Sequence, residues 1–412
     1  MRIPVIMMII TLLGSVLIDL YITLDIRRST KKELWWKAYA VSALLCIGFI
    51  IFVFCQPRRS EDTDILPVMW MLYSIISVYV GKLVYVIFSL IGRLISCFRS
   101  KKKRPGHAMQ WIGLVCALFV FGSLWWGVGV TRHKIMVVDV DIDSPKVPRP
   151  FDGYRIAQIS DLHVGTWGND TTFISTLVDS VNSLKPDLIV FTGDIVNRRT
   201  DELTPFLPVL SRLHAPDGVL SILGNHDYGD YVDWSTPEQR TANNQKLADY
   251  QRKMGWDLLN NRRVFKTRDN DSIMLIGVEN VGDPPFPTYG DLDRALSPSR
   301  DSIFHQNDRR FKILLTHNPE HWNQDVSRDT NIDLTLSGHT HAMQIMFKVG
   351  GFEWSPAVFR YELWGGLFQR LNEEGQKTRL YVNIGAGEVG MPSRLFSAYP
   401  EITLITLHHQ AQ

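Results

Sequence analysis

Four long apolar stretches in the first 130 residues constrain the fold more strongly than any other feature of this chain. They cover Ile3–Leu24, Leu34–Cys55, Leu66 to about Phe98, and Trp111–Val130. A helix that crosses a bilayer needs about 20 mostly apolar residues, and each stretch reaches that length. Five tryptophans near the proposed ends match an interfacial aromatic belt: Trp35, Trp36, Trp111, Trp125 and Trp126. We therefore predict a multi-pass membrane protein, with a transmembrane domain of about four helices over residues 1–130.

The first stretch has a second interpretation, as a secretory signal peptide. It lacks a charged leading segment beyond Arg2 and an obvious small-residue cleavage site, and three further apolar stretches follow it. We therefore favour an uncleaved first span. Asp19 and Lys37 lie close enough to span ends to snorkel. Lys82 lies nearer the centre of a span, and we hypothesise as an alternative for Asp19 that these two residues pair across helices.

The loops between the stretches indicate an orientation. The first and third loops are rich in basic residues: Arg27, Arg28, Lys31 and Lys32, and Arg99, Lys101, Lys102, Lys103 and Arg104. In the second loop Arg58 and Arg59 are offset by Glu61, Asp62 and Asp64. Cytoplasmic loops carry an excess of Lys and Arg, so the first and third loops are predicted to face the cytoplasm. The chain after residue 130 then lies on the extracytoplasmic side.

The charge balance differs between the two parts of the chain. Residues 1–130 carry 15 Lys and Arg against 6 Asp and Glu, a balance of +9, whereas residues 131–412 carry 29 against 36, a balance of −7. Nucleic acids bind mainly through neutralisation of their phosphates by Lys and Arg, so nucleic acid is an unfavourable partner for the acidic part. The four cysteines (Cys46, Cys55, Cys97 and Cys116) all fall in the apolar stretches, where they are expected to pack as small apolar residues.

Five short apolar runs in the second part are each followed directly by Asp, His or Asn. The runs are Arg155–Ser160, Leu188–Thr192, Val219–Leu223, Phe311–Thr316 and Leu334–Ser337. The segments that follow them are Asp161-Leu162-His163, Gly193-Asp194, Gly224-Asn225-His226-Asp227, His317 and Gly338-His339-Thr340-His341. The runs are typical of buried strands, and α/β folds bind ligands at the carboxyl ends of such strands. We therefore expect these side chains to converge on one sheet edge.

Imidazole and carboxylate groups gathered in one place indicate a metal site. Mn²⁺, Fe²⁺ and Zn²⁺ accept this donor set, and residues 131–412 contain no cysteine to supply a thiolate. Two such cations about 3.5–4 Å apart clamp a phosphoryl group and make hydroxide available near neutral pH. The pattern therefore favours chemistry at phosphorus.

The five segments, in this order, resemble the complete motif set of the calcineurin-like metallophosphoesterase superfamily over about residues 135–408. The resemblance implies a first metal ion held by Asp161, His163 and His341, a second held by Asn225, His317 and His339, and Asp194 as the bridge between them. It also implies that His226 contacts the phosphoryl oxygen and protonates the leaving group. Asp227 would orient the His226 ring.

The remaining strands complete a fold. Val137–Asp143 alternates as a strand that enters the catalytic domain, and Ser272–Val278, Leu380–Ile384 and Ile402–Leu407 are further strands. Thr241–Met254 is predicted to be a helix, either a crossover or a partial lid. Two sheets packed face to face with helices outside accommodate all of them, which is also the fold that the resemblance implies. We predict an α/β fold, a two-sheet β-sandwich flanked by helices, with a connection over 131–153 and a catalytic domain over 154–408.

An aromatic segment follows the last motif. Between residues 343 and 368 the chain holds Met343, Ile345, Met346, Phe347, Phe352, Trp354, Phe359, Tyr361, Leu363, Trp364, Leu367 and Phe368. Two interpretations stay open. These side chains either pack beneath the sheet, or form an exposed apolar rim that dips into the bilayer or grips an acyl chain.

The function that follows is a membrane-anchored phosphoesterase with two divalent metal ions, which attacks phosphorus with a metal-activated hydroxide. Because some membrane-associated relatives act on lipid-linked nucleotides or phospholipid head groups, the resemblance favours a phosphodiester or pyrophosphate bond in a lipid-related substrate. A cytoplasmic UDP-sugar lipid would require the opposite orientation to the one derived above. A general phosphomonoesterase, a membrane sensor or transporter regulated by a phosphoesterase domain, and a non-enzymatic scaffold are the alternatives.

Overall fold

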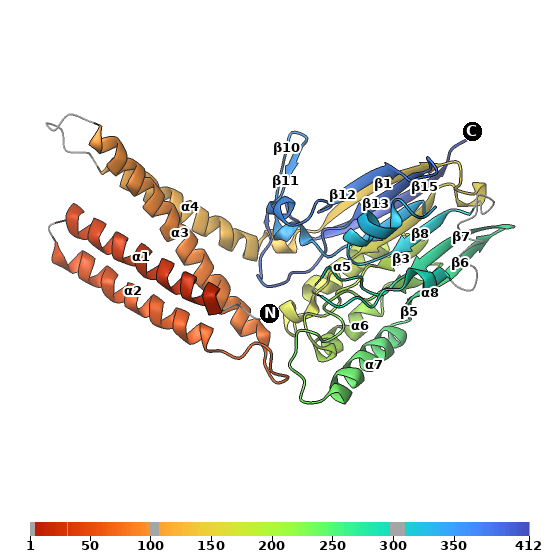
Figure 1. Cartoon of the computed structure of the whole chain (residues 1–412), viewed down its shortest axis with the longest axis horizontal. Helices are drawn as coiled ribbons and strands as arrows, with labels where there is room; N and C mark the ends of the chain where they lie inside the picture. Colours follow the sequence, from red (N-terminus) through yellow and green to blue (C-terminus); the bar gives the residue numbers. More distant parts are fainter. Residues whose placement is uncertain (1–4, 31, 99–106, 285, 297–309, 412) are drawn as a thin grey trace. The chain divides into compact units, whose positions relative to one another are not determined.

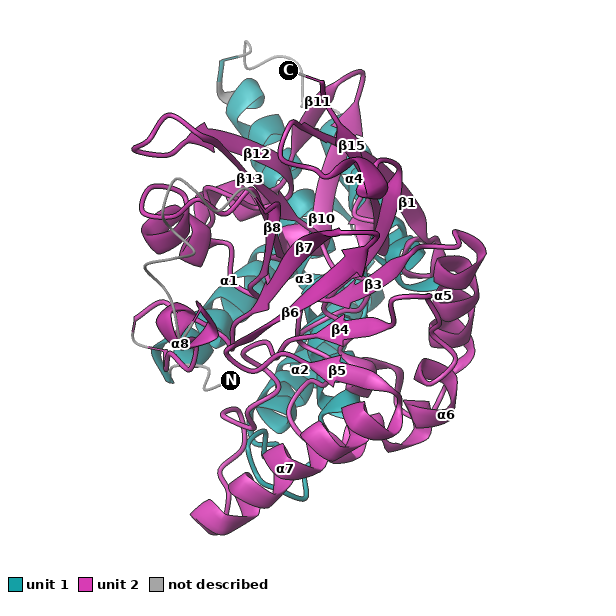
Figure 2. Ribbon diagram, turned by 90° about the vertical axis from the view of Figure 1, so that its right-hand side faces the viewer, with its two compact units in different colours: residues 1–129, 390–393 teal, residues 130–389, 394–412 magenta. Residues whose placement is uncertain are grey.

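A computed structural model describes residues 5–30, 32–98, 107–284, 286–296 and 310–411. The chain divides into two compact units, shown in different colours in Figure 2. Unit 1 comprises residues 1–129 and 390–393, and unit 2 comprises residues 130–389 and 394–412. The domain limits predicted from the sequence stay predictions.

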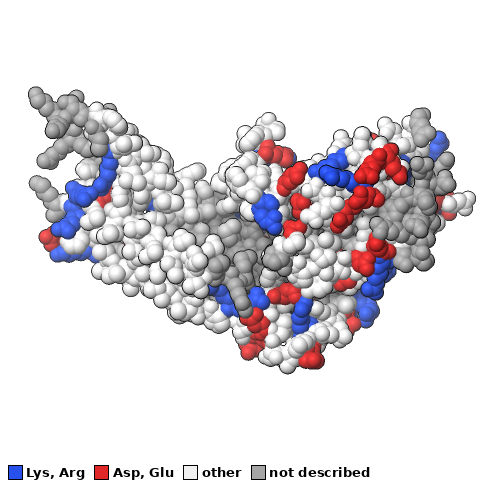
Figure 3. Space-filling model, viewed as in Figure 1, with Lys and Arg blue, Asp and Glu red and all other residues white. Residues whose placement is uncertain are grey.

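Unit 1 contains four helices that are long and apolar enough to cross a membrane, which confirms the predicted transmembrane region. They are α1 (Val5–Ser29), α2 (Glu33–Phe54), α3 (Ile65–Cys97) and α4 (Ala108–Gly129), and Figure 1 shows them as a bundle of rods. In Figure 3 the sides of these helices are mostly white, and Lys and Arg lie toward their ends, with the larger group on the left. The third stretch forms one continuous helix of 33 residues.

Two buried carboxylates hold α1 against α3. Asp19 lies 2.7 Å from the ammonium group of Lys82, which confirms the hypothesised pair, and it also accepts hydrogen bonds from Tyr39 and Tyr79. A second ion pair, which the sequence analysis missed, joins Asp25 to Arg93 one to two turns further along. Charges inside a membrane are tolerated when they face the bundle interior and are paired. Both pairs therefore support a structural role.

The first large sheet of unit 2 has the order β1-β15-β2-β3-β4-β5. Its strands are β1 (Met136–Ser144), β15 (Glu401–His409), β2 (Tyr154–Ile159), β3 (Leu188–Phe191), β4 (Val219–Ser221) and β5 (Trp256–Leu258). The four strands from β2 to β5 run parallel, so the loops that follow β2, β3 and β4 emerge at one edge. The predicted entry strand lies within β1.

The second large sheet has the order β12-β13-β9-β8-β7-β6. Its strands are β12 (Gly366–Leu371), β13 (Lys377–Val382), β9 (Leu334–Ser337), β8 (Lys312–Leu315), β7 (Asp271–Gly277) and β6 (Arg262–Arg268). The four central strands are parallel, and the two edge strands pair antiparallel with their neighbours. The carboxyl ends of β8 and β9 thus lie side by side.

The two sheets pack face to face. Ile156, Val190 and Leu220 of the first sheet lie in one buried cluster with Leu275 and Ile313 of the second. The outer face of the first sheet is covered by α5 (Thr172–Ser183), α6 (Leu207–Leu210) and α7 (Pro237–Lys253), and that of the second by α8 (Leu292–Leu296) and the turn Trp322–Val326. This arrangement confirms the predicted α/β sandwich flanked by helices.

Helix α7 begins earlier than the predicted Thr241 because a capping box starts it. The side chain of Thr236 accepts from the backbone N–H of Gln239, and the Gln239 side chain accepts from the backbone of Thr236. Leu247 of this helix is buried in the cluster outside the first sheet. The helix is therefore a crossover that covers the sheet.

A third, small sheet follows the last motif. It has the order β11-β10-β14, with β10 (Ile345–Val349), β11 (Phe352–Trp354) and β14 (Leu395–Phe396). Figure 1 shows the β10–β11 hairpin standing away from the two large sheets.

Candidate metal centre

The nine predicted site residues all lie in loops that leave the carboxyl ends of parallel strands. Asp161 and His163 follow β2, Asp194 follows β3, and Asn225, His226 and Asp227 follow β4. His317 follows β8, and His339 and His341 follow β9. Because β2 to β4 belong to one sheet and β8 and β9 to the other, the site forms where corresponding edges of the two sheets meet.

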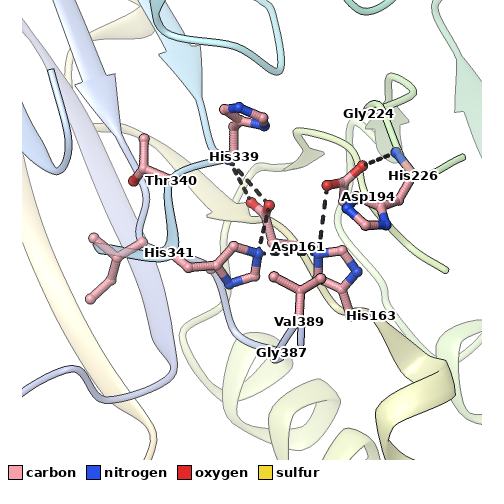
Figure 4. Close-up of polar contacts among 12 residues, drawn as sticks. Asp161, His163, Asp194, Gly224, His226, His339, Thr340, His341, Gly387 and Val389 are labelled. Atoms are coloured by element: carbon pink, nitrogen blue, oxygen red, sulfur yellow. Dashed lines mark hydrogen bonds and ion pairs between the residues drawn. The ribbon is translucent and has the colours of Figure 1, made fainter. Parts of the chain in front are cut away.

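One group of possible ligands consists of Asp161, His163 and His341, whose ligand atoms lie within 4.8 Å of one another. The Nε2 atom of His341 lies 3.2 Å from a carboxylate oxygen of Asp161. The same nitrogen lies 3.1 Å from Nε2 of His163. Figure 4 shows these three side chains pointing toward one another. The group matches the first set that the resemblance implies, and its role as a metal site stays a prediction.

A second group consists of Asp194, His317 and His339. The Nε2 atom of His317 lies 3.1 Å from the Asp194 carboxylate, 3.2 Å from the amide oxygen of Asn225, and 3.3 Å from Nδ1 of His339. The same Asp194 oxygen, Oδ2, lies 3.5 Å from Nε2 of His163. Asp194 therefore stands between the two groups, where a bridging carboxylate has to be.

The backbone supports this convergence at a cost in strain. Five of the nine residues have positive φ angles: Asp161 (54°), His163 (42°), Asp194 (60°), His339 (77°) and His341 (52°). Residues other than glycine rarely adopt this conformation, and they persist in it when the surrounding structure enforces it, often at functional sites. The positive φ angles let neighbouring side chains of these short loops point toward the candidate metal centre.

Two motif glycines are required because a carboxylate occupies the place of a β-carbon. A Cβ at Gly338 would lie 2.2 Å from an Asp161 oxygen, and a Cβ at Gly224 would lie 2.2 Å from an Asp194 oxygen. Both distances are far below any allowed contact. The glycines thus let the loops close around the two acids.

His226 borders the site from the β4 loop. Its Nδ1 lies 2.7 Å from the carbonyl oxygen of Asn197, and its backbone N–H donates to Asp194 at 2.8 Å. A carbonyl oxygen only accepts, so Nδ1 carries a proton and Nε2 is left for another partner. The ring stacks on Tyr231, with centroids 4.3 Å apart.

The structure corrects the expected partner of the His226 ring. Asp227 was predicted to orient the imidazole, and the carbonyl of Asn197 does so instead. The buried Asp227 carboxylate accepts from the backbone N–H groups of four residues: Asp194, Ile195, Val196 and Gly224. It therefore fixes the backbone of the loop that carries Asp194.

Burial and close charges shift the acid–base equilibria of the cluster. Burial opposes ionisation of Asp194, but the imidazoles of His317 and His226 outweigh it and hold the Asp194 pKa well below its usual range. Burial raises the pKa of Asp227 to about 7, and the charge of Asp194 adds to this. Burial and then the nearby His317 lower the pKa of His339 to about 3, so this imidazole stays neutral and able to act as a ligand.

The donor set fits divalent cations. Two buried carboxylates and several imidazoles lie close together, and borderline divalent metals bind this combination of oxygen and nitrogen donors. The Nδ1 atom of His163 is buried without a hydrogen-bond partner in the described part of the chain. His163 faces the other possible ligands through its second ring nitrogen, Nε2.

Three residues near the cluster were missed by the sequence analysis. Asn197 holds His226, as described above, and Arg394 is fully buried with Nη2 3.4 Å from Nδ1 of His341. Glu388 is buried and lies 2.9 Å from the guanidinium group of Arg132. Asn197 is the first polar residue after the Gly193-Asp194 segment, which is a usable signal. The sequence around Arg394 and Glu388 carries none.

Comparisons with known proteins agree with this geometry. Residues 154–343 match the family model described as calcineurin-like phosphoesterase. Residues 1–132 match the model described as probable calcineurin-like phosphoesterase, transmembrane domain.

Three relatives show how far the similarity extends. An uncharacterized metallophosphoesterase of Bacillus subtilis, YkuE, is 32% identical over 71% of this chain and 92% of its own length. A Danio rerio transmembrane protein with metallophosphoesterase domain is 28% identical over 91% of this chain and 79% of its own length. The UDP-2,3-diacylglucosamine pyrophosphatase LpxG of Chlamydia trachomatis is 30% identical over 68% of this chain and 91% of its own length.

Proposed function

Because this chain belongs to the calcineurin-like phosphoesterase family and is therefore a phosphoric ester hydrolase, we propose that it cleaves a phosphodiester or pyrophosphate bond in a lipid-related substrate with two divalent metal ions. The observation that carries the metal part is the position of Asp194 between two groups of ligands. The lipid part is supported by the four helices able to span a membrane and by the similarity to a pyrophosphatase of a diacylated nucleotide sugar. The orientation proposed below excludes a cytoplasmic UDP-sugar lipid as the substrate itself, so the similarity supports the lipid class only.

The proposed ligands divide as the two groups do. One ion would be held by Asp161, His163 and His341. The other would be held by Asn225, His317 and His339, and Asp194 would bind both ions. When bound, Mn²⁺, Fe²⁺ or Zn²⁺ at these positions would supply hydroxide near neutral pH and neutralise charge on the phosphoryl group. Asp227 would act as a positioning residue through the backbone of the Asp194 loop.

His226 is proposed to serve the leaving group. Its Nδ1–H is held by the carbonyl of Asn197, and the stacked Tyr231 ring restricts its rotation. Its Nε2 is then left for the substrate. In the doubly protonated ring, Nε2–H would donate to a phosphoryl oxygen and give this second proton to the departing oxygen. Burial lowers the pKa of His226, so the negative charge of the bound substrate would have to favour the protonated form. A positioned acid of this kind contributes about 10²–10⁴-fold to the rate.

We also propose that unit 2 comprises the catalytic domain, over 154–408, and lies on the extracytoplasmic side. The support is the excess of Lys and Arg in the α1–α2 and α3–α4 loops of the sequence. The alternatives are a general phosphomonoesterase and a membrane sensor or transporter. The ion pairs inside unit 1 are satisfied by partners, so they do not favour the second alternative.

The test is hydrolysis by the detergent-purified full chain with Mn²⁺. It compares bis-p-nitrophenyl phosphate with p-nitrophenyl phosphate, and follows head-group loss from a lipid extract. We expect cleavage of the diester and loss of one lipid species. Turnover of the monoester alone, with lipids untouched, would favour the general phosphomonoesterase.

An Asp194→Asn variant tests the two-metal arrangement. The amide keeps the shape of the side chain but removes the shared charge, so we expect loss of hydrolysis with the fold retained. Addition of Mn²⁺ to chelator-treated wild type should raise the unfolding temperature, since saturation to 100 times Kd stabilises by about 2.7 kcal/mol. The variant should lose most of this rise. Retained turnover in Asp194→Asn would contradict the arrangement.

A further inference from the structure

The aromatic segment that follows His341 divides into a buried and an exposed half. Met346 packs in a small cluster with Ala342, Ile384 and Ala398, and Leu363 is buried in the cluster outside the second sheet. The exposed part includes Val349, Phe352 and Phe359, with exposed fractions of 73%, 64% and 83%, and Phe396 of the neighbouring strand β14 joins them with 46%. We call these four residues the apolar rim. Part of the segment is therefore buried, as the first interpretation expects, and part is exposed, as the second requires; contact with lipid stays a prediction.

The apolar rim is held in shape by ring contacts. Phe396 stacks on Phe347, with centroids 4.2 Å apart, and Phe347 lies 5.9 Å from its cross-strand partner Trp354. Trp354 meets the ring of Phe359 edge to face at 6.3 Å. Exposed aromatic rings that rest on one another in this way lose little further freedom on binding. The rim is thus a preformed apolar surface.

The charges on the hairpin are neutralised. Lys348 and Glu353 stand opposite each other across β10 and β11 and form an ion pair. In the view of Figure 3, the end of the projection that Figure 1 draws as β10–β11 is white. An apolar end above a paired charge suits the boundary between lipid head groups and acyl chains.

The rim is continuous with the candidate metal centre. Met343, two residues after His341, is partly exposed, and the chain then enters β10. From the other side, Tyr361 follows Phe359 by two residues, and its hydroxyl lies 3.5 Å from Nε2 of His339. The chain segment that carries Phe359 thus reaches the ligand His339 through Tyr361.

The apolar rim needs a binding partner that is always near the protein, and the tether to the helices shows that lipid is such a partner. Helix α4 ends at Gly129 and β1 begins at Met136, so the connection reaches at most about 25 Å even when fully extended. A lipid surface is thus always within reach of unit 2. We propose that the apolar rim inserts into the lipid–water interface of the membrane that α1 to α4 span, and admits a lipid substrate to the metal centre along its surface. The delivery of a lipid substrate rests on the proposed function, whereas the insertion of the rim does not.

Spin labels on the full chain in proteoliposomes test the insertion. In a background whose four native cysteines are replaced, nitroxides are attached to Phe352→Cys and to Leu371→Cys. Leu371 is the matched control, because it is equally exposed at 66% but lies at the far end of β12, opposite Lys377. We expect the ratio of oxygen to nickel-chelate accessibility to be several-fold higher at position 352 than at 371. Equal, water-like ratios would overturn the insertion.

Kinetics test the delivery of substrate. A Val349→Ser/Phe352→Ser variant should lose about tenfold in turnover of the vesicle lipid, with bis-p-nitrophenyl phosphate turnover unchanged. Leu371→Ser should change neither. If the labels insert but the wild type cleaves no vesicle lipid, the insertion stands and the lipid part of the proposed function fails. Equal loss of both activities in the variant would overturn the delivery role.

Discussion

At the scale of single residues, the site depends on side chains aimed by strained backbone. Five of the nine predicted site residues adopt positive φ, and Gly224 and Gly338 leave room for the carboxylates of Asp194 and Asp161. Such positions cost of order 1–3 kcal/mol each and are kept when function requires them. The proposed metal binding explains why the site residues are Asp, His and Asn. The close approach of the loops that carry them explains their backbone conformation.

His226 also lies in a third group of possible ligands, with His163 and Asp194, so a test of its proposed role as an acid has to separate that role from metal binding. Replacement by Asn should reduce kcat by about 10²–10⁴-fold. The loss should be larger for diesters with poor leaving groups than for p-nitrophenyl esters, because a general acid helps a basic leaving oxygen most. The measurement is the dependence of kcat on the pKa of the leaving group. His214→Gln, at an exposed histidine, is the control. An equal loss for all esters, with unchanged metal content, would contradict the role as an acid.

At the scale of elements, a buried ion pair ties the chain entering β1 to the loop after β13. Arg132 lies 2.9 Å from Glu388, both side chains are almost fully buried, and the guanidinium lies 4.1 Å from the Trp167 ring. Arg132→Met should cost about 3–5 kcal/mol, because it leaves a buried carboxylate without its partner. Arg132→Met/Glu388→Gln should recover part of this.

The measurement for this pair is the midpoint of unfolding of the purified protein. The control is Arg252→Met, which removes an exposed pair with Asp249 and should cost less than about 1 kcal/mol. A double variant no more stable than Arg132→Met would show that the pair does not act as a unit.

Helices α1 and α3 should depend on the pair between Asp19 and Lys82. Asp19→Lys or Lys82→Asp alone places like charges together inside the bundle, where one unpaired charge costs about 2.5–3.5 kcal/mol. Each single variant should lose monodisperse protein on size exclusion after extraction in detergent. Asp19→Lys/Lys82→Asp should restore it in part. If the double variant gave as little monodisperse protein as the single variants, the pairing would be excluded as a contribution to folding.

Sequence patterns predicted elements well and long-range contacts poorly. The runs before each motif were predicted because buried parallel strands are continuously apolar and end in a turn residue. The start of α7 was missed because its capping box, Thr236 with Gln239, precedes the apolar positions. Arg394 acts through His341 of the β9 loop and Glu388 through Arg132 before β1, and no local pattern records these contacts. The second intramembrane pair, Asp25 with Arg93, was missed because Asp25 stands where an apolar stretch ends.

At the scale of the whole molecule, four spans fix which segments share a side of the membrane. A chain that crosses four times returns to its starting side, so unit 2 must lie on the same side as the loop between α2 and α3. Basic residues concentrate in the other two loops. By the positive-inside tendency those loops are expected to be cytoplasmic, which supports the proposed extracytoplasmic position of unit 2.

Cysteine labelling in intact cells tests this orientation, in a background without the four native cysteines. Single cysteines at Glu61, between α2 and α3, and at Asp179, on α5, should react with a membrane-impermeant maleimide. A cysteine at Thr30, between α1 and α2, should react only after the membrane is opened. The reverse pattern at all three positions would place unit 2 in the cytoplasm, because the shared side of Glu61 and Asp179 follows from four crossings alone. The substrate would then have to come from the cytoplasmic leaflet. Labelling of Glu61 and Asp179 on opposite sides would instead contradict the number of spans.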